Sequence, residues 1–206
     1  GANAETSRLQ RDCMPDSNGT ILSGDIDENG ILDDDNSYHV VICVGSQNAV
    51  LDGFTIEYGN ANGNEDYDKV GGGLYNLGLP DDLLYTTIRR CIFRNNKSLT
   101  AGGAMINQSA CPYIENCLFY DNEAGVSGSA ICCFNLAPQT PDDALIIKNC
   151  TISENQSDGS LCGAVYLQDC GMQGQNFGAI LFLNTILWDN HDDEDNDILI
   201  DNSYAE

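Results

Sequence analysis

The stretch TIRRCIFRNN at residues 87–96 decides the fold, because related versions of it recur along the chain. They are VLDGFTIEYGN at 50–60, YIENCLFYDN at 113–122, IIKNCTISEN at 146–155 and LFLNTILWDN at 181–190. Recurrence every few tens of residues is the sequence signature of a solenoid. A second phrase follows each copy: GGGLYN at 71, GGAMIN at 102, GSAICC at 128, CGAVYL at 162 and a weaker NDILI at 196. Each repeat therefore contains two short strands.

The spacing of the copies argues against a helix in every repeat. The equivalent positions are Leu51, Ile88, Ile114, Ile147 and Phe182, at steps of 37, 26, 33 and 35 residues. These steps are too short for a strand–helix–strand unit in every repeat. We therefore predict an all-β fold, a right-handed parallel β-helix of about five irregular coils.

Alternation within the copies predicts which side chains face the interior. Cys91 and Phe93 point to one side of their strand, and Ile92 and Arg94 to the other. Stacking the copies in register gives one interior row of Phe54, Cys91, Cys117, Cys150 and Thr185. The next interior row is Ile56, Phe93, Phe119, Ile152 and Leu187.

An asparagine follows the first interior row by five residues in the last four copies. These are Asn96, Asn122, Asn155 and Asn190. Amide side chains stacked at the strand spacing of about 4.8 Å can bond to their copies above and below. We therefore predict a buried asparagine ladder. The pairs Gly72–Gly73 and Gly102–Gly103 fall where the chain has to turn tightly into the next strand.

Charge and composition limit the classes of partner. The 206 residues include 8 Lys plus Arg against 32 Asp plus Glu, which gives a formal net charge of -24. This charge repels phosphate backbones and anionic headgroups, so we expect no nucleic-acid partner. No apolar run is long enough to span a bilayer, so we expect no membrane insertion. Calcium is the small partner that such an acidic surface favours.

The 10 cysteines favour an oxidising compartment, and we expect a secreted protein, extracellular or at the cell surface. Cys91, Cys117 and Cys150 either pack in the interior as thiols or form disulfides between stacked coils. Disulfides between coils could also be formed by Cys132, Cys133 and Cys162 on the second strand row and by Cys111 and Cys170 beyond it. Cys13 and Cys43 are a candidate pair at the front.

One segment has the spacing of a calcium-binding loop. In DIDENGILDDDN at 25–36, the ligand positions fall on Asp25, Asp27, Asn29, the Ile31 carbonyl and Asp33. Gly30 stands at the sharp turn. Asn36 replaces the usual bidentate Glu at the twelfth position, and a solvated acidic loop is the alternative interpretation.

The outward face of the first strand row is a candidate ligand or interface face. Its members are Glu57, Arg94, Tyr120, Ser153 and Trp188. Glu57 and Arg94 are expected to form an ion pair between neighbouring coils. Tyr120 and Trp188 are candidates for stacking on sugars. No pair of carboxylates recurs at one strand position, so we assign no catalytic residue and leave enzyme activity undecided, with a non-enzyme favoured.

The NCxFxxN and GGAI-like repeats resemble secreted bacterial β-helix proteins, including those with polymorphic outer-membrane-protein-like repeats. The opening, ETSRLQRDCMPDSNGTILSGDIDENG, is similar to that of large β-helix proteins anchored at the cell surface. The resemblance implies one β-helix domain over residues 1–206. It would comprise a front segment with the acidic loop at 1–37, coils at 38–200 and a tail at 201–206, and it could be a piece of a longer chain.

The two ends of such a stack expose open strand edges. Neither the front nor the tail has the apolar stripe of a capping helix. We therefore expect a structural surface module and a homo-oligomer that assembles end to end into a filament or array, with residues 197–204 meeting 20–22 or 40–44 of the next copy. A protein that binds or cleaves polysaccharide is the alternative.

Overall fold

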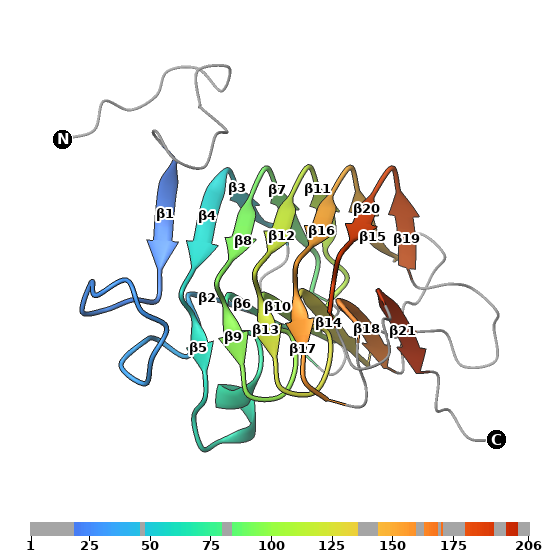
Figure 1. Ribbon diagram of the computed structural model, residues 1–206. Helices are drawn as coiled ribbons and strands as arrows, with labels where there is room; N and C mark the ends of the chain where they lie inside the picture. The colour runs from blue at the N-terminus through green and yellow to red at the C-terminus, as the bar shows by residue number, and fades with distance from the viewer. Residues whose placement is uncertain are drawn as a thin grey trace, which may run out of the picture.

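The computed structural model describes residues 19–45, 48–79, 84–135, 144–159, 163–168, 170, 180–191 and 197–201. The chain winds through four sheets, which we call A to D (Figure 1). Neighbouring strands within each sheet are parallel. A single turn visits sheets C, A, D and B in that order. The prediction of an all-β parallel β-helix is confirmed.

Sheets A and B each contain six strands. Sheet A comprises β1 (Thr20–Ser23), β4 (Phe54–Glu57), β8 (Ile92–Arg94), β12 (Leu118–Tyr120), β16 (Thr151–Ser153) and β20 (Ile186–Trp188). Sheet B comprises β2 (Val41–Val44), β6 (Leu74–Leu77), β10 (Met105–Gln108), β14 (Ile131–Phe134), β18 (Val165–Gln168) and β21 (Ile198–Asp201). The second phrase of each repeat forms a strand of sheet B, whereas the first phrase contains a strand of sheet C as well as one of sheet A. The prediction of two short strands in each repeat was therefore too low.

The other two sheets are smaller. Sheet C comprises β3 (Ala49–Asp52), β7 (Thr86–Arg89), β11 (Tyr113–Glu115), β15 (Leu145–Lys148) and β19 (Ile180–Leu183). Sheet D comprises β5 (Asn60–Ala61), β9 (Lys97–Ser98), β13 (Glu123–Ala124) and β17 (Gln156–Ser157). The five strands of sheet C are separated by four turns of the solenoid. The structure thus has about four turns rather than the five predicted, because the five copies of the first phrase mark the boundaries of turns. The helical content of the described part is one 3-10 turn, η2 (Asp66–Lys69).

The register of sheet A agrees with the alignment of the repeats. Ile56, Phe93, Phe119, Ile152 and Leu187 follow one another in a single row. The rings of Phe93 and Phe119 are stacked with centroids 4.9 Å apart and planes 5° apart. Phe54, Thr185 and Leu187 are only partly buried, contrary to the expectation for fully interior rows, because they belong to the outermost turns.

The corners of the solenoid are formed by residues in the left-handed backbone conformation. Between sheets C and A these are Gly53, Arg90, Asn116, Asn149 and Asn184, with φ between 48° and 76°. Between sheets A and D they are Tyr58, Asn95, Asp121, Glu154 and Asp189. Asparagine and aspartate tolerate this conformation better than most side chains do. The left-handed residue bends the chain at the same place in every turn.

Two consecutive glycines meet different demands at the entry to sheet B. Gly102 has a φ of 67°, whereas a Cβ on Gly103 would lie 2.3 Å from the Glu123 carbonyl oxygen of the next turn. Gly102 therefore provides the turn and Gly103 the close approach. The turns at this corner pack over the outer side of sheet B, where they cover a second apolar cluster that alternation alone does not predict. It comprises Tyr75, Ala101, Ile106, Cys132 and Tyr166.

Candidate functional site

The outward row of sheet A contains the residues that the sequence analysis chose as a ligand or interface face. Glu57, Arg94, Tyr120, Ser153 and Trp188 follow one another in the observed register. Arg94 donates from Nε to Glu57 Oε2 at 2.7 Å and from Nη1 to the Tyr120 hydroxyl at 3.1 Å. Trp188 is 70% exposed and lies two turns beyond Tyr120. The structure thus joins Glu57, Arg94 and Tyr120 through side-chain hydrogen bonds and leaves Trp188 apart.

Arg94 is held as a permanent cation. Burial acts to lower its pKa, but hydrogen bonds from Arg94 to Tyr120 and Glu57, together with the Glu57 charge, raise that pKa well above its ordinary value. Glu57 is 7% exposed, so the pair is more enclosed than an ordinary surface ion pair. A guanidinium fixed in this way links neighbouring turns, and it is unsuited to act as a base.

A column of alternating charge runs up the outer side of sheet C, and the sequence analysis did not identify it. Asp52, Arg89, Glu115 and Lys148 occupy one register position in successive turns. Arg89 Nε lies 3.1 Å from Asp52 Oδ2, and Lys148 Nζ lies 2.8 Å from Glu115 Oε1. Arg90 also pairs with Asp52. The signal was present in the sequence, since these four residues directly follow the aligned positions Leu51, Ile88, Ile114 and Ile147.

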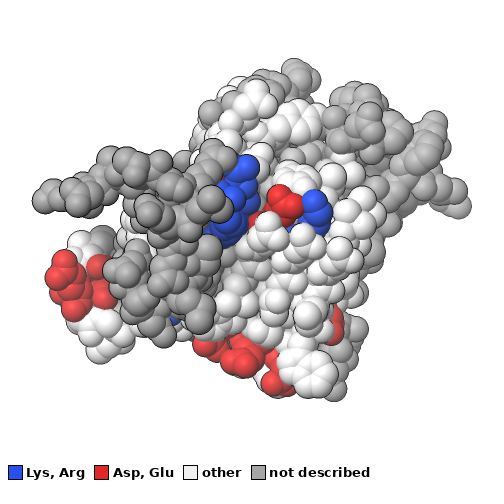
Figure 2. All heavy atoms as spheres, turned by 90° about the horizontal axis from the view of Figure 1, so that it is seen from above, with Lys and Arg blue, Asp and Glu red and all other residues white. Residues whose placement is uncertain are grey.

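Each Lys and Arg in the described part of the chain pairs with a carboxylate. Besides the residues of sheets A and C, Lys97 pairs with Glu123 on sheet D and Lys69 with Asp66 in η2. Figure 2 shows basic and acidic side chains together near the centre of one face, with other acidic side chains standing apart at its edges. Apart from Lys69, these cations therefore join turns of the solenoid, and the surplus of negative charge lies in the loops.

The acidic loop leaves the solenoid after β1 and returns to it before β2. Gly24 N donates to Glu57 O, and Ser37 N donates to Gly24 O, each at 2.8 Å. Between them, Asp25 accepts hydrogen bonds from the backbone of Asn29 and Gly30. The Gly30 N–H lowers the pKa of the Asp25 carboxyl.

The ligand positions proposed for calcium lie together within this loop. The Asn29 side-chain amide donates to Asp27 Oδ2 at 2.9 Å and to Asp33 Oδ2 at 3.0 Å. Ile31 N donates to Asn29 Oδ1 at 2.6 Å. Among the described residues there is no group of three or more His, Cys, Asp or Glu arranged to hold a metal ion. Calcium binding at this loop stays a prediction.

Asn36, at the twelfth position of the loop, has a structural role. It is 4% exposed, its Nδ2 donates to the Tyr58 carbonyl at 2.9 Å, and its Oδ1 accepts from Asp33 N at 3.2 Å. Its amide caps the corner of the first turn as the ladder asparagines do in later turns. A glutamate at this position would bring a charge into a buried corner, which explains the departure from the calcium-loop pattern.

The asparagine ladder lies at the corner between sheets A and D. Asn96, Asn122, Asn155 and Asn190 are between 0% and 8% exposed. The amide of each donates to Oδ1 of the next, from Asn96 to Asn122 at 3.0 Å and from Asn122 to Asn155 and Asn155 to Asn190 at 2.9 Å. Asp197 accepts from Asn190 and ends the row. The ladder thus joins successive turns from inside.

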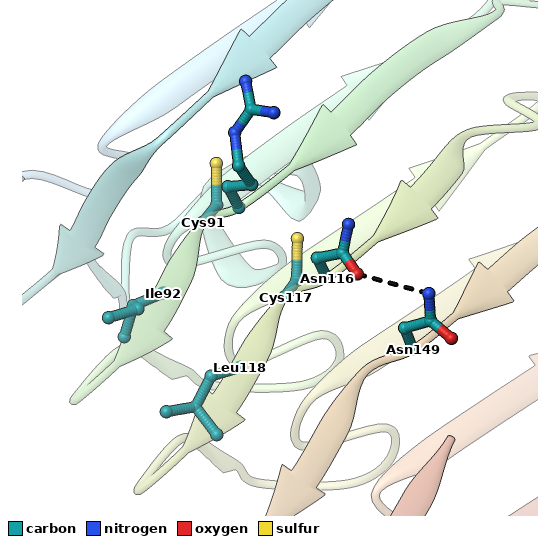
Figure 3. Close-up of a pocket in the computed structure, with 7 residues that line it drawn as sticks. Cys91, Ile92, Asn116, Cys117, Leu118 and Asn149 are labelled. Carbon is teal, nitrogen blue, oxygen red and sulfur yellow. Dashed lines mark hydrogen bonds between the residues drawn. The ribbon is translucent and has the colours of Figure 1, made fainter. Parts of the chain in front are cut away.

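A second, exposed ladder stands at the corner between sheets C and A. Asn184 donates to Asn149 and Asn149 to Asn116, each at 3.3 Å. These asparagines precede the cysteine row, and their recurrence in the NC and NT dipeptides was the signal that could have identified them. Asn116 and Asn149 line, with Arg90, one side of an open depression of about 450 Å³ (Figure 3).

The cysteine row forms the floor of this corner. Cys91, Cys117 and Cys150 are 1%, 4% and 1% exposed. A hydrogen bond from Cys117 lowers the pKa of the Cys91 thiol, and burial raises the pKa of Cys117 well above its usual range. The three thiols pack in the interior, as one of the two alternatives predicted.

No disulfide joins two of the cysteines that the structure describes. Cys43, Cys132 and Cys133 are free thiols, and the predicted staples between coils are therefore not found there. Cys132 and Cys133 point to opposite sides of β14, one into the outer cluster and one into the core. Cys170 donates from Sγ to the Cys133 carbonyl at 3.4 Å. Cys13 and Cys162 lie outside the described residues, as do the front at 1–18 and the tail at 202–206.

No protein-family model, curated protein or solved structure matches the chain. In the part that the structure describes, no helix has the length and apolar character needed to cross a membrane. The candidate site therefore has to be judged from the geometry of this chain alone.

Proposed function

We propose that the chain is an extracellular structural module whose copies assemble end to end into a filament or array. The observation that carries the proposal is the state of the two outermost turns. Sheets A, B and C begin at β1, β2 and β3 and end at β20, β21 and β19, and each of these strands has one neighbour among the described strands. Edge strands with unpaired backbone groups favour pairing with another chain.

Exposed apolar side chains gather on the same strands. At the front they are Ile21, Ile42, Val44 and Val50, between 45% and 58% exposed. At the other end they are Leu181, Leu183, Ile186, Trp188 and Ile198, between 36% and 70% exposed. Exposed large apolar groups gathered in this way favour contact with a partner surface.

The interior of the first turn is also open. A hollow of about 210 Å³ lies between β2 and β3 and is lined in part by Leu51, Leu74 and Ile88 of the core. In interior turns, the equivalent space is filled by the next turn. A second copy is the occupant that matches this end best, since its last turn presents the same sheets in the same parallel order.

The register indicates how two copies would meet. β21 of one copy would extend sheet B at β2 of the next, and β20 would extend sheet A at β1. Because this contact is heterologous and does not close on itself, it would propagate as a filament. The net charge of -24 opposes assembly, so counterions or divalent cations should promote it.

Sedimentation velocity of the whole chain over a range of concentrations tests this proposal. The wild type should form larger species in calcium and moderate salt, and fewer of them in chelator. Ile42→Lys and Ile186→Lys, which place a charge on the two end turns, should keep the protein monomeric. Leu99→Lys is the matched control, because Leu99 is 50% exposed on an inner turn. Equal behaviour of all three variants would rule out docking through the ends.

Polysaccharide binding is the second candidate, and the exposure of Trp188 supports it. An exposed indole on the same sheet as Tyr120 offers two aromatic faces for sugar rings. Trp188→Ala should then abolish retention on a polysaccharide affinity gel while Leu99→Ala leaves it unchanged. Export to the cell surface rests on the resemblance of the repeats and on the cysteine count, and the free thiols add no support to it.

A further inference from the structure

The three thiols of the cysteine row stand in a column with regular spacing. Their strands are neighbours in sheet A, so their Cα atoms are separated by about 4.8 Å from one turn to the next. Each sulfur lies near the backbone carbonyl two residues earlier and a carbonyl of the preceding turn, at distances between 3.2 and 3.8 Å. The thiols therefore share one orientation.

Two of these thiols border the open depression at the corner. Its lining includes Arg90, Cys91, Asn116 and Cys117, whereas Cys150 is not part of it. Figure 3 shows the sulfur atoms of Cys91 and Cys117 projecting in the same direction from adjacent turns. Both cysteines are almost fully buried, so an ion reaches the pair when the side chains at the rim move aside.

We propose that Cys91 and Cys117 form a two-coordinate site for a soft monovalent metal ion of the Cu(I) or Ag(I) type. A metal–thiolate bond is about 2.3 Å long, so one ion between the neighbouring sulfurs of two adjacent turns reaches both. Thiolate ligands select soft ions of this kind. Zinc needs four ligands in a tetrahedron, and among the described residues no third Cys, His or carboxylate completes such a set.

Binding releases two protons and changes no oxidation state. Each thiol loses its proton to solvent as its sulfur bonds to the ion, and two thiolates with one monovalent cation carry a net charge of minus one. Arg90 lines the same depression, where its guanidinium pairs with Asp52.

Threonine is the conservative substitution for these cysteines, because the structure contains that replacement. Thr185 occupies the same row one turn beyond Cys150, and its hydroxyl donates to Ile147 O at 3.2 Å and Leu183 O at 3.1 Å. These are the counterparts of the carbonyls that Cys150 contacts. Cys91→Thr and Cys117→Thr should therefore keep the fold while removing one ligand each.

Titration of the reduced full-length chain with Ag(I) against a competing thiol chelator tests the site. The wild type should bind one more tight equivalent than either variant, whereas Cys43→Thr and Cys150→Thr should match the wild type. X-ray absorption should give two sulfur neighbours for the lost equivalent. Equal stoichiometry in the wild type and Cys91→Thr would overturn the proposal.

Protection from alkylation provides a second readout that needs no variant. Ag(I) at one equivalent should slow alkylation of Cys91 and Cys117 in the wild type, as measured by peptide mass spectrometry, relative to Cys43. Protection of Cys43 alone, or of neither column thiol, would place the ion elsewhere and refute the site.

Discussion

Asn122 shows how a single buried side chain joins three turns of the solenoid. Its Nδ2 donates to the Phe93 and Tyr120 carbonyls, each at 3.0 Å, and to Oδ1 of Asn155 at 2.9 Å. Its Oδ1 accepts from the backbone and the amide of Asn96. Because water cannot reach this corner, each of these groups depends on the asparagine for its partner.

Asn122→Ala should therefore destabilise the protein strongly. Leaving buried donors and acceptors unpaired costs about 1–3 kcal/mol for each group, so we expect a loss of at least about 3 kcal/mol in the free energy of unfolding. Urea unfolding followed by circular dichroism measures it. Gln156→Ala, on the exposed side of β17, is the control and should change stability by less than about 0.5 kcal/mol. Similar midpoints for both variants would mean that the ladder contributes little.

The acidic loop provides a prediction about calcium. If Asp25, Asp27 and Asp33 bind the ion with the affinity of extracellular modules, about 10 mM calcium should stabilise the fold by about 1–3 kcal/mol. A thermal melt after chelation and re-addition of calcium measures this. Asp27→Asn should remove the effect. Asp66→Asn, which removes one charge from η2, should keep the stabilisation by calcium. An equal melting temperature of the wild type with and without calcium would contradict the site.

At the scale of the strand, charge alternation on sheet C stabilises the stacking of turns. Burial acts to raise the pKa of Asp52, but hydrogen bonds and charges from Arg90 and Arg89 bring it below its ordinary value. A hydrogen bond from Lys148 likewise lowers the pKa of Glu115. For a carboxyl whose pKa is lower in the folded state, the stabilisation is complete above the unfolded pKa. It is lost as pH falls through the folded value.

Asp52→Asn should reveal this dependence. At pH 6 the variant should unfold at a lower urea concentration than the wild type, and the difference should shrink as pH falls below about 4, where an unfolded Asp begins to gain its proton. Asp158→Asn makes the same change of charge at an exposed position and corrects for general repulsion. A difference between wild type and Asp52→Asn that stays constant from pH 6 to pH 2.5 would contradict the role assigned to the pair.

The strands could be predicted from sequence because each repeat carries its own alternation. Cys91 and Phe93 face inward and Ile92 and Arg94 outward, so one register satisfied every copy. The packing of loops over Ile106 and Cys132 could not be predicted, because the loops that lead into sheet B differ in length from one repeat to the next. The charge column could have been found from the same alignment, because Asp52, Arg89, Glu115 and Lys148 directly follow the aligned positions Leu51, Ile88, Ile114 and Ile147.

The candidate site was predicted less completely than the strands. The Glu57–Arg94 pair followed from adjacent copies, and the acidic loop from its spacing. The burial of Asn36 did not, because it depends on where the loop returns to the solenoid. The exposed ladder from Asn116 to Asn184 also depends on a left-handed corner that a strand pattern does not specify.

At the scale of the whole molecule, the two ends are alike in form. Within the described residues, each end presents the outermost strands of sheets A, B and C and a set of exposed apolar side chains, while the inner turns are bonded on both sides. Figure 1 shows the strands of each sheet stacked along one axis, so that a further copy would continue the same direction. An assembly of this kind grows by extending sheets A and B from one copy to the next.

Electron microscopy of the natively isolated protein, with its diffraction, tests the structural account most directly. Six strands in sheets A and B predict an axial advance of about 29 Å for each subunit, with a reflection at about 4.8 Å along the filament. Filaments with that repeat, dispersed by Ile42→Lys and retained in Leu99→Lys, are the expected result. A stable monomer at high concentration, in calcium and moderate salt, would contradict end-to-end assembly.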